Sequence, residues 1–309
     1  MIKGTYIISQ DGKEICRAEN TITKFGKRFL TEYLAGNVID GKKDIAIGIA
    51  STSSTINDTR LGFEFYRVPV SFGSTNIQTI DGVTSYGVVF KATLPQDIAG
   101  SINELGLYPS TRSSSNNYDS KFISDFASPL NWIDTDSFNP AVDYANAKIG
   151  DNVLKMQSNL STAREYFYNI GSFDMSGYSA NDSIKIAYYQ YDTRLSSVTV
   201  KFYSSDNDYY KYEFISDGSV GYKISPDILL SSVYSSPTGS PDKSQINKIG
   251  ISVKTNTTTA TYVGMDGLRI NDEDTFDANF GLISRAVITE FTKSVGQPID
   301  IEYRLALGF

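Results

Sequence analysis

The stretch that decides the fold is Ile102-Asn103-Glu104-Leu105-Gly106-Leu107-Tyr108, because no hairpin partner follows it nearby. Apolar side chains recur along it, and Gly106 permits close approach of a neighbouring backbone, as in a short buried strand. A polar run at 111–117 follows, and the first plausible partner is Gly281-Leu282-Ile283-Ser284-Arg285-Ala286-Val287-Ile288. We therefore predict an outer domain formed by residues 1–112 and 277–309, interrupted by an inserted domain at 113–276.

The composition is that of a folded, β-rich protein. The chain has 309 residues, of which 40% are apolar and 20% charged, and it contains 21 Tyr and 17 Phe. Aromatic residues are enriched in strands, and a chain of this length ordinarily forms more than one core. The predicted fold class is mainly β: a discontinuous β-rich outer domain with one N-terminal amphipathic helix, interrupted by an antiparallel β-sandwich or jelly roll.

Charge and residue usage exclude several function classes. The net charge is −7 and no block of Lys or Arg stands out, so no nucleic-acid partner is expected. The sequence has no His and one Cys, Cys16, which excludes intrachain disulfides, zinc sites built on Cys or His, and nucleophiles activated by imidazole. Cys16 is interpreted as a small apolar strand residue rather than a reactive thiol. No cofactor is expected.

The hydropathy pattern gives no sign of a membrane segment. No apolar stretch approaches the ~20 residues needed to cross a bilayer. The N-terminus also lacks the charged and apolar regions of a cleaved export signal. We therefore expect neither membrane insertion nor export by such a signal.

Local signals in the outer domain indicate one hairpin, one helix and several strands. Asp11-Gly12 is a hairpin turn signal. Thr21 or Thr23 can cap a helix that Gly36 ends, and the apolar residues between them recur at three- and four-residue spacing. Pro69 places its strand at a sheet edge. The expected strands are 3–9, 14–20, 44–50, 60–70 and 86–92.

The motifs of the outer domain occur in a distinctive order. After the helix come Ile45-Ala46-Ile47-Gly48, Asp58-Thr59-Arg60-Leu61, Glu64-Phe65-Tyr66-Arg67-Val68-Pro69-Val70, Val89-Phe90-Lys91-Ala92-Thr93-Leu94, Asn103-Glu104-Leu105-Gly106-Leu107-Tyr108, Leu282-Ile283-Ser284-Arg285-Ala286-Val287 and Phe291-Thr292-Lys293-Ser294. This order resembles the fibre-type virion domain of tailed bacteriophages, the module of collar and tail-fibre proteins. The insertion departs from that family, whose Gly-Leu-Tyr and Ser-Arg-Ala strands are joined by a short turn.

The resemblance implies a structural component of a tailed-phage virion, in a tail fibre, collar, neck or baseplate. Such a protein docks on neighbouring virion proteins as a homo-oligomer, a trimer if it is fibre-like. Its location would be the phage particle, after assembly in the bacterial host cytoplasm. A capsid decoration role is an alternative, and the resemblance does not specify what the insertion adds.

The inserted domain is predicted to be an antiparallel β-sandwich. Alternating strands are expected at 183–188, 197–203, 210–214, 249–253, 261–263 and 268–270, with turn residues between them. Trp132, Phe173-Asp174-Met175-Ser176-Gly177-Tyr178 and the closing segment Tyr262-Val263-Gly264-Met265-Asp266-Gly267-Leu268-Arg269-Ile270 are similar to concanavalin-like and carbohydrate-binding jelly rolls. This second resemblance implies an alternative function, recognition of host-surface glycans.

Tyrosines make the densest aromatic cluster of the chain. They comprise Tyr188, Tyr189 and Tyr191 on one strand, and Tyr203, Tyr209, Tyr210 and Tyr212 on the next two. Residues that alternate with core positions can form an exposed stacking surface for a sugar ring. The candidate ligand-binding residues are Tyr188, Tyr189, Tyr191, Tyr209 and Tyr210. Ordinary cross-strand tyrosine pairing is the favoured interpretation of the same pattern, and glycan binding is the alternative.

Carboxylates suggest two further kinds of chemistry. Acidic residues gather near both ends of the insert, at Asp134, Asp136, Asp266, Asp272, Glu273 and Asp274. If these ends are neighbours, their oxygens could converge on Ca²⁺. A solvated acidic loop is favoured because the ligand spacing is not fixed, so no metal is predicted. A glycosidase pair of Glu165 with Asp174 or Asp182 is also not favoured, because nothing places these carboxylates face to face. No enzyme is predicted.

Three charged residues of the outer domain lie within the family motifs. We expect Arg67, Glu104 and Arg285 to form ion pairs that mark strand register. Surface pairs of this kind contribute only ~0–1 kcal/mol.

Overall fold

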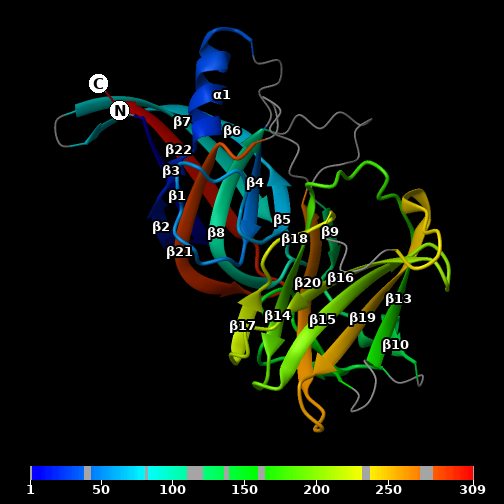
Figure 1. Ribbon diagram of the computed structural model, residues 1–309. Coiled ribbons are helices and arrows are strands. Elements are labelled where there is room, and N and C mark those ends of the chain that lie inside the picture. The colour runs from blue at the N-terminus through cyan, green and yellow to red at the C-terminus, as the bar shows by residue number, and fades with distance from the viewer. Residues whose placement is uncertain are drawn as a thin grey trace. The chain divides into compact units, whose positions relative to one another are not determined.

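The computed structural model describes residues 2–37, 43–80, 83–109, 121–135, 139–158, 164–231, 237–271 and 281–308 (Figure 1). The chain divides into two compact units. Unit 1 comprises Met1–Ser115 and Thr275–Phe309, and unit 2 comprises Asn116–Asp274. No helix within the described ranges is long and apolar enough to cross a membrane.

In its described residues, unit 1 contains two antiparallel five-stranded sheets and one helix. The first sheet has the order β2 (Lys13–Glu19), β1 (Ile2–Gln10), β22 (Ile299–Gly308), β7 (Val83–Leu94) and β6 (Ser71–Ile80). The second has the order β3 (Thr21–Ile22), β21 (Ser284–Lys293), β8 (Gly100–Pro109), β4 (Lys43–Gly48) and β5 (Glu64–Pro69). Tyr6 of the first sheet and Ser284 of the second share a buried hydrogen bond of 3.0 Å between their hydroxyls.

The partner predicted for the strand at 102–108 is present. Strand β21 pairs with β8 in antiparallel register, with Leu107 opposite Ser284 and Leu105 opposite Ala286. The predicted hairpin of β1 and β2 is also present. Pro69 ends β5, the edge strand of its sheet, as the sequence indicates.

Helix α1 (Lys24–Leu34) begins and ends at the predicted signals. The hydroxyl of Thr23 accepts a hydrogen bond from the backbone N–H of Gly26 at 2.9 Å, which makes Thr23 the N-cap. Gly36 adopts a φ of 79°, and its N–H bonds to the carbonyl of Tyr33, as in a Schellman ending. Phe25 and Phe29 are the aromatic residues that the helix buries.

Glu104 and Arg285 form a buried ion pair, which corrects the expectation of surface register markers. Arg285 Nη2 lies 2.8 Å from Glu104 Oε2, and Glu104 is fully buried. The Glu104 carboxylate also accepts the backbone N–H groups of Gly62 at 2.9 Å and Phe63 at 2.8 Å. The pair therefore fixes the loop before β5 as well as the register of β8 and β21. Arg67 pairs instead with Glu64 on its own strand.

Unit 2 is an antiparallel β-sandwich, as predicted. One sheet has the order β10 (Trp132–Asp134), β13 (Arg164–Phe173), β19 (Ile246–Thr255), β15 (Leu195–Tyr203) and β16 (Tyr209–Ile215). The other has the order β11 (Ala141–Asp143), β12 (Val153–Gln157), β20 (Tyr262–Asn271), β14 (Ser183–Gln190) and β17 (Gly221–Ile224). In that sheet, β9 (Lys121–Ser124) pairs with β20 and β18 (Ile228–Leu229) pairs with β14. The described part of unit 2 also has the short 3-10 helices η1 (Pro129–Asn131) and η2 (Lys243–Gln245).

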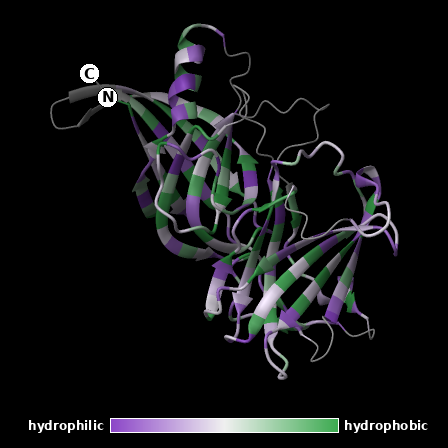
Figure 2. Ribbon diagram, viewed as in Figure 1, coloured by the Kyte–Doolittle hydropathy of each residue, from purple (hydrophilic) through white to green (hydrophobic). Residues whose placement is uncertain are grey.

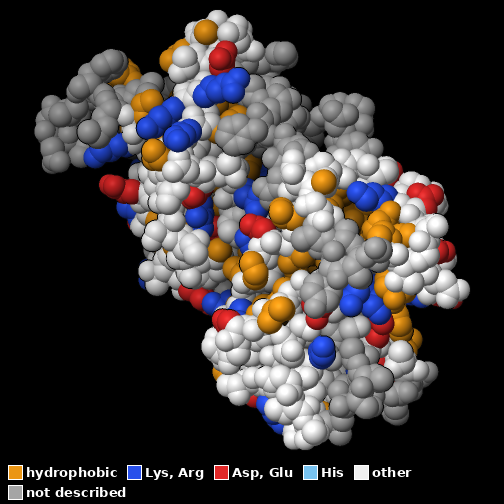
Figure 3. Space-filling view, viewed as in Figure 1, with side chains coloured by type: hydrophobic (Ala, Val, Ile, Leu, Met, Phe, Trp, Pro, Cys, Tyr) orange, Lys and Arg blue, Asp and Glu red, His pale blue; other side chains and the backbone are white. Residues whose placement is uncertain are grey.

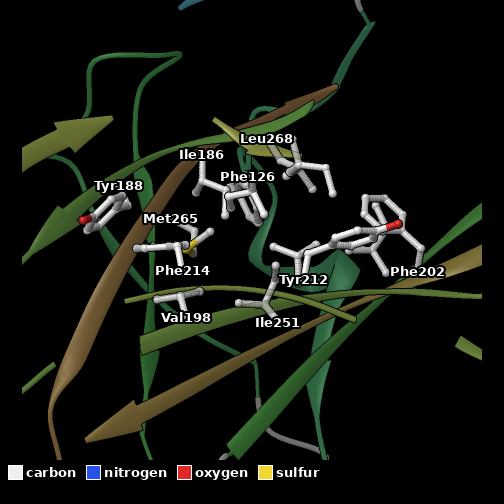
Figure 4. Packing of buried hydrophobic residues seen from close by; sticks show 14 of the residues in the cluster. Phe126, Ile186, Tyr188, Val198, Phe202, Tyr212, Phe214, Ile251, Met265 and Leu268 are labelled. Carbon is white, nitrogen blue, oxygen red and sulfur yellow. The ribbon is translucent and has the colours of Figure 1, made fainter. Parts of the chain in front are cut away.

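The core of unit 2 lies between its two sheets. Figure 4 shows side chains of both sheets converging, with Ile186 and Met265 from one and Val198 and Ile251 from the other. Hydropathy alternates along these strands (Figure 2), so one set of side chains enters the core and the next points outward. The outward-pointing residues are the ones available to a ligand.

Candidate functional site

The predicted tyrosine cluster is divided between the two sheets of unit 2. Tyr188 and Tyr189 lie on β14 and Tyr191 directly follows it, whereas Tyr209 and Tyr210 lie on β16 of the opposite sheet. The chain passes from one sheet to the other at residues 191–194. Strands β14 and β15, which follow each other in sequence, are therefore not neighbours, and the five tyrosines do not form one surface.

Two of the five predicted residues face the core. Tyr188 is buried, and its ring centroid lies 5.0 Å from that of Phe214 (Figure 4). Burial raises the pKa of Tyr188 to about 12. Tyr210 packs against the same core, and its hydroxyl donates to the carbonyl of Pro241 at 2.9 Å. Tyr188 is therefore buried in the core and Tyr210 partly buried against it, so neither lies on the outward surface of its sheet, and ligand binding by either remains a prediction.

Tyr189 and Tyr191 belong to the outer surface of the β11–β12–β20–β14–β17 sheet, here called the Tyr191 face. Their ring centroids are 4.9 Å apart. The ammonium of Lys155 lies 4.6 Å from the ring centroid of Tyr191 and 4.5 Å from that of Tyr262. Gly264 lies beneath Tyr191, because a Cβ there would stand 3.2 Å from the tyrosine hydroxyl. The Tyr191 face comprises Lys155, Tyr189, Tyr191, Tyr222 and Tyr262.

The polar groups of the Tyr191 face are occupied by neighbours within the fold. Tyr191 donates its hydroxyl hydrogen to Asp143. Burial and this negative carboxylate raise the pKa of Tyr191. Tyr222 donates to Asp266, which also accepts the backbone N–H groups of Lys148 at 2.9 Å and Ile149 at 3.0 Å. These bonds tie the edge strands and the loop before β12 to the sheet, which is a structural use of the tyrosines.

Tyr209 belongs to the outer surface of the β10–β13–β19–β15–β16 sheet, here called the Glu165 face. Across this sheet Phe167 is opposite Gly250, which is opposite Lys201. In the adjacent row Lys248 is opposite Tyr203, which is opposite Tyr209. The Glu165 face comprises Glu165, Phe167, Lys201, Tyr203, Tyr209 and Lys248.

Glu165 is a nearly buried carboxylate on this outward surface. Lys201 Nζ donates to its Oε2 at 2.6 Å, and the hydroxyl of Tyr203 donates to its Oε1 at 2.6 Å. Burial and the adjacent carboxylate raise the pKa of Tyr203, so it remains a donor. Gly250 makes room for this arrangement, because a Cβ there would stand 2.2 Å from Glu165 Oε1. The carboxylate therefore has a fixed position above the centre of the sheet.

Aromatic rings and ammonium groups surround that carboxylate. The ring centroids of Tyr203 and Tyr209 are 4.7 Å apart, and Phe167 meets Tyr203 edge to face at 5.9 Å. Lys201 Nζ lies 4.9 Å from the Tyr209 centroid, and Lys248 Nζ lies 4.5 Å from the Tyr203 centroid. Fixed rings beside fixed hydrogen-bonding groups are the features that orient a polar ligand with apolar faces.

The charges of the Glu165 face balance within the fold. Lys201 pairs with Glu165, and Lys248 pairs with Asp206. On the face of the molecule shown in Figure 3, Lys and Arg side chains are interspersed with Asp and Glu rather than gathered over unit 2. This pattern does not favour a polyanionic ligand.

The acidic residues proposed for Ca²⁺ do not converge where the structure describes them. Asp134 lies on β10 and pairs with Arg164, whereas Asp266 lies on β20 of the other sheet. No group of three potential metal ligands occurs among the described residues. Asp136, Asp272, Glu273 and Asp274 lie outside those residues.

The three carboxylates considered for glycoside cleavage have separate partners. Glu165 is engaged by Lys201 and Tyr203, as described above. Asp174 accepts the N–H of Ser176 at 2.8 Å, and Asp182 accepts the N–H of Ser179 at 2.7 Å.

Sequence reasoning named Glu165, Tyr203 and Tyr209 separately, but it missed Phe167, Lys201 and Lys248 and did not join the six residues into the Glu165 face. Strand β13, which carries Glu165 and Phe167, was not among the expected strands. Its run Glu165-Tyr166-Phe167-Tyr168 places aromatic residues on both faces, which hides the period of two. Alternation does mark Lys201 and Tyr203 as outward, because Val200 and Phe202 between them are core residues. Lys248 could be placed only once the partners of β19 were known.

The chain thus combines an antiparallel β-sandwich with a second β-rich unit, whose two segments come before and after the sandwich in sequence. No family model and no curated protein matches the sequence. Among solved structures, the family 30 carbohydrate-binding module of a Clostridium thermocellum cellulosomal cellulase is 12% identical, with a TM-score of 0.39, over 50% of this chain and 99% of that one. A family 11 carbohydrate-binding module from the same organism is 15% identical, with a TM-score of 0.37, over 50% and 97%. An agarase is 11% identical, with a TM-score of 0.35, over 52% of this chain and 25% of that one. Similarities of this strength do not assign a function.

Proposed function

We propose that unit 2 is a carbohydrate-binding unit that uses the Glu165 face. The observation that carries this proposal is the carboxylate of Glu165, held above Gly250 by Lys201 and Tyr203 and flanked by aromatic rings. A surface that serves only solubility does not require a fixed, nearly buried acceptor. A sugar ring offers C–H groups on its faces and hydroxyls at its edge, so it suits rings beside fixed donors and acceptors.

The expected ligands are neutral polysaccharides. Each ammonium of the Glu165 face has a carboxylate partner, so the face has no unbalanced positive charge for an anionic chain. Binding should therefore depend little on salt. We further propose that unit 2 binds without cleaving its ligand.

Affinity electrophoresis through gels containing diverse neutral polysaccharides tests this proposal. Phe167→Ala and Tyr209→Ala should each weaken binding by about tenfold or more, which corresponds to the loss of one stacking contact of ~1.5 kcal/mol. Tyr189→Ala is the matched control, because it removes a half-buried tyrosine from the opposite sheet, and it should leave binding unchanged.

Two outcomes would contradict the proposed site. If Tyr189→Ala or Tyr191→Ala abolishes binding while Phe167→Ala does not, the ligand lies on the Tyr191 face. If no polysaccharide binds the unaltered protein, unit 2 has no such function. Shortened products after prolonged incubation would contradict binding without cleavage.

We also propose that unit 1 anchors the protein in a tailed-phage particle. One support is the order of motifs in the sequence. The other is the pairing of β8 with β21, because these strands lie directly before and directly after the insert in sequence and are neighbours in the sheet. In this proposal unit 1 supplies attachment and unit 2 supplies carbohydrate binding. Electron microscopy of particles that contain the protein is the test. Density on a tail appendage, collar or baseplate is expected, and density on the capsid lattice would contradict a fibre or collar role.

A further inference from the structure

Strand β6 is an edge strand with no charged residue. It has the sequence Ser71-Phe72-Gly73-Ser74-Thr75-Asn76-Ile77-Gln78-Thr79-Ile80 and ends the first sheet of unit 1. Within the described residues, its only strand partner is β7. After a register shift between Phe72 and Ser74, seven consecutive residues pair regularly, from Ser74 to Ile80. One side of a long, regular strand therefore has no strand partner in the described fold.

The other edges of the described sheets are protected. At the opposite edge of the same sheet, β2 has the sequence Lys-Glu-Ile-Cys-Arg-Ala-Glu. Proteins commonly protect edges with charges, prolines or short strands, because an open edge can pair with another chain. Every remaining edge strand in the described residues is three residues or shorter or carries a charged side chain. Strand β6 lacks all of these protections.

Apolar side chains accompany this open edge. Ile77 is opposite Tyr86 on β7, which is opposite Leu307 on β22, which is opposite Ile2 on β1. Ile77 is 66% exposed and Tyr86 56% exposed. Figure 1 shows this end of the hairpin beside the two chain termini. Exposed apolar side chains therefore stand on β6 and β7 next to the open edge.

We propose that β6 pairs with β6 of a second copy of this chain, in antiparallel orientation across a two-fold axis. Two antiparallel copies of one edge form an isologous interface, which closes on itself. Because β6 has no charge, its two copies do not repel each other. Unit 1 has equal numbers of acidic and basic residues, so the net charge of −7 resides in unit 2. The partner's β6 extends the first sheet by one strand-to-strand pairing. It also places the same residues of the partner beside Ile77, so that the two copies contact each other through apolar side chains.

Sedimentation equilibrium of the full-length protein over a range of concentrations tests this proposal. The unaltered protein should be a dimer at micromolar concentration. Replacing both Thr75→Lys and Ile77→Lys places like charges across the interface and should raise the dimer dissociation constant at least a hundredfold. Both side chains are exposed, so the fold should persist. The matched control is Ile15→Lys, at a 44% exposed isoleucine of the opposite edge strand β2, which should leave the dimer unchanged.

Hydrogen exchange provides a readout that does not depend on the variants. The backbone amides of residues 74–80 that point away from β7 should exchange slowly at concentrations where the dimer forms and at least tenfold faster on dilution below its dissociation constant. A monomer at all concentrations would overturn the proposal. A trimer would also overturn it, as would a dimer that survives Thr75→Lys with Ile77→Lys.

Discussion

Asp266 shows how the setting of one side chain can make stability depend on pH. Burial raises the pKa of Asp266 to about 7, and the nearby Asp125 adds to the effect. Hydrogen bonds from Tyr222, Lys148 and Ile149 act in the opposite direction, but all three reach Oδ2. Oδ1 is buried and has no hydrogen-bond partner among the described residues. We infer that burial outweighs the hydrogen bonds in setting the pKa of Asp266 because this oxygen has lost its water and gained no donor.

The unfolding free energy should fall as the pH rises from about 4 to about 7. The folded state binds the Asp266 proton more tightly than the unfolded chain, whose carboxyl has a pKa near 3.9. The stabilising contribution of this group is therefore complete below about pH 4 and is lost as the pH passes 7. The loss amounts to at most about 4 kcal/mol. Urea unfolding from pH 5.5 to 8.5 should give a smaller pH slope for Asp266→Asn than for the unaltered protein.

Asp143→Asn is the control for this pH dependence. Partial burial would raise the pKa of Asp143, but hydrogen bonds from Tyr191 and Asn146 outweigh it and lower the pKa. The contribution of Asp143 is therefore present above about pH 4 and lost only as the pH falls. Its replacement should change stability by a constant amount between pH 5.5 and 8.5. An unchanged pH slope in Asp266→Asn would contradict the assignment to Asp266.

At the scale of the secondary-structure element, α1 could be predicted from its own residues. Its start, end and buried face depend on neighbours within four positions, which a single sequence displays directly. What the sequence does not display is the contact between α1 and the returning chain. The backbone N–H of Thr23 donates to the carbonyl of Ile283 at 3.1 Å, and a Cβ on Gly26 would stand 2.0 Å from the same oxygen. That glycine has a role only after residues far apart in sequence have met.

The strands of unit 2 show the same difference between local and distant information. The expected strands at 183–188 and 197–203 lie within β14 and β15, because apolar residues alternate along each. Their membership of different sheets depends on pairing with β20 and β19, which are distant in sequence. The sequence therefore identifies the outward residues Tyr189, Tyr191 and Tyr209, but it does not show that they lie on two different sheets.

At the scale of the whole molecule, the two units have separate cores. The cluster of buried residues in unit 2 runs from Phe126 to Ile270 and contains no residue of unit 1. A cluster of unit 1 combines Ala46, Leu61 and Tyr108 with Leu282, which lies beyond the insert. The sheets of unit 1 therefore need both of its chain segments, but their described cores do not need unit 2.

Replacing residues 111–280 by a short glycine-containing turn should leave unit 1 folded. Leu107 is opposite Ser284, and the N–H of Ile283 donates to the carbonyl of Leu107 at 2.8 Å, so the remaining ends already meet as in a hairpin. We expect the shortened chain to unfold in one cooperative thermal transition and to retain association through β6. Residues 116–274 expressed alone should also unfold cooperatively, stay monomeric and bind polysaccharide within about twofold of the full chain. Calorimetry, sedimentation and affinity electrophoresis measure these three properties.

A shortened chain without a cooperative transition would mean that unit 2 is required for unit 1 to fold. If the shortened chain binds polysaccharide and residues 116–274 do not, carbohydrate recognition belongs to unit 1 rather than to unit 2.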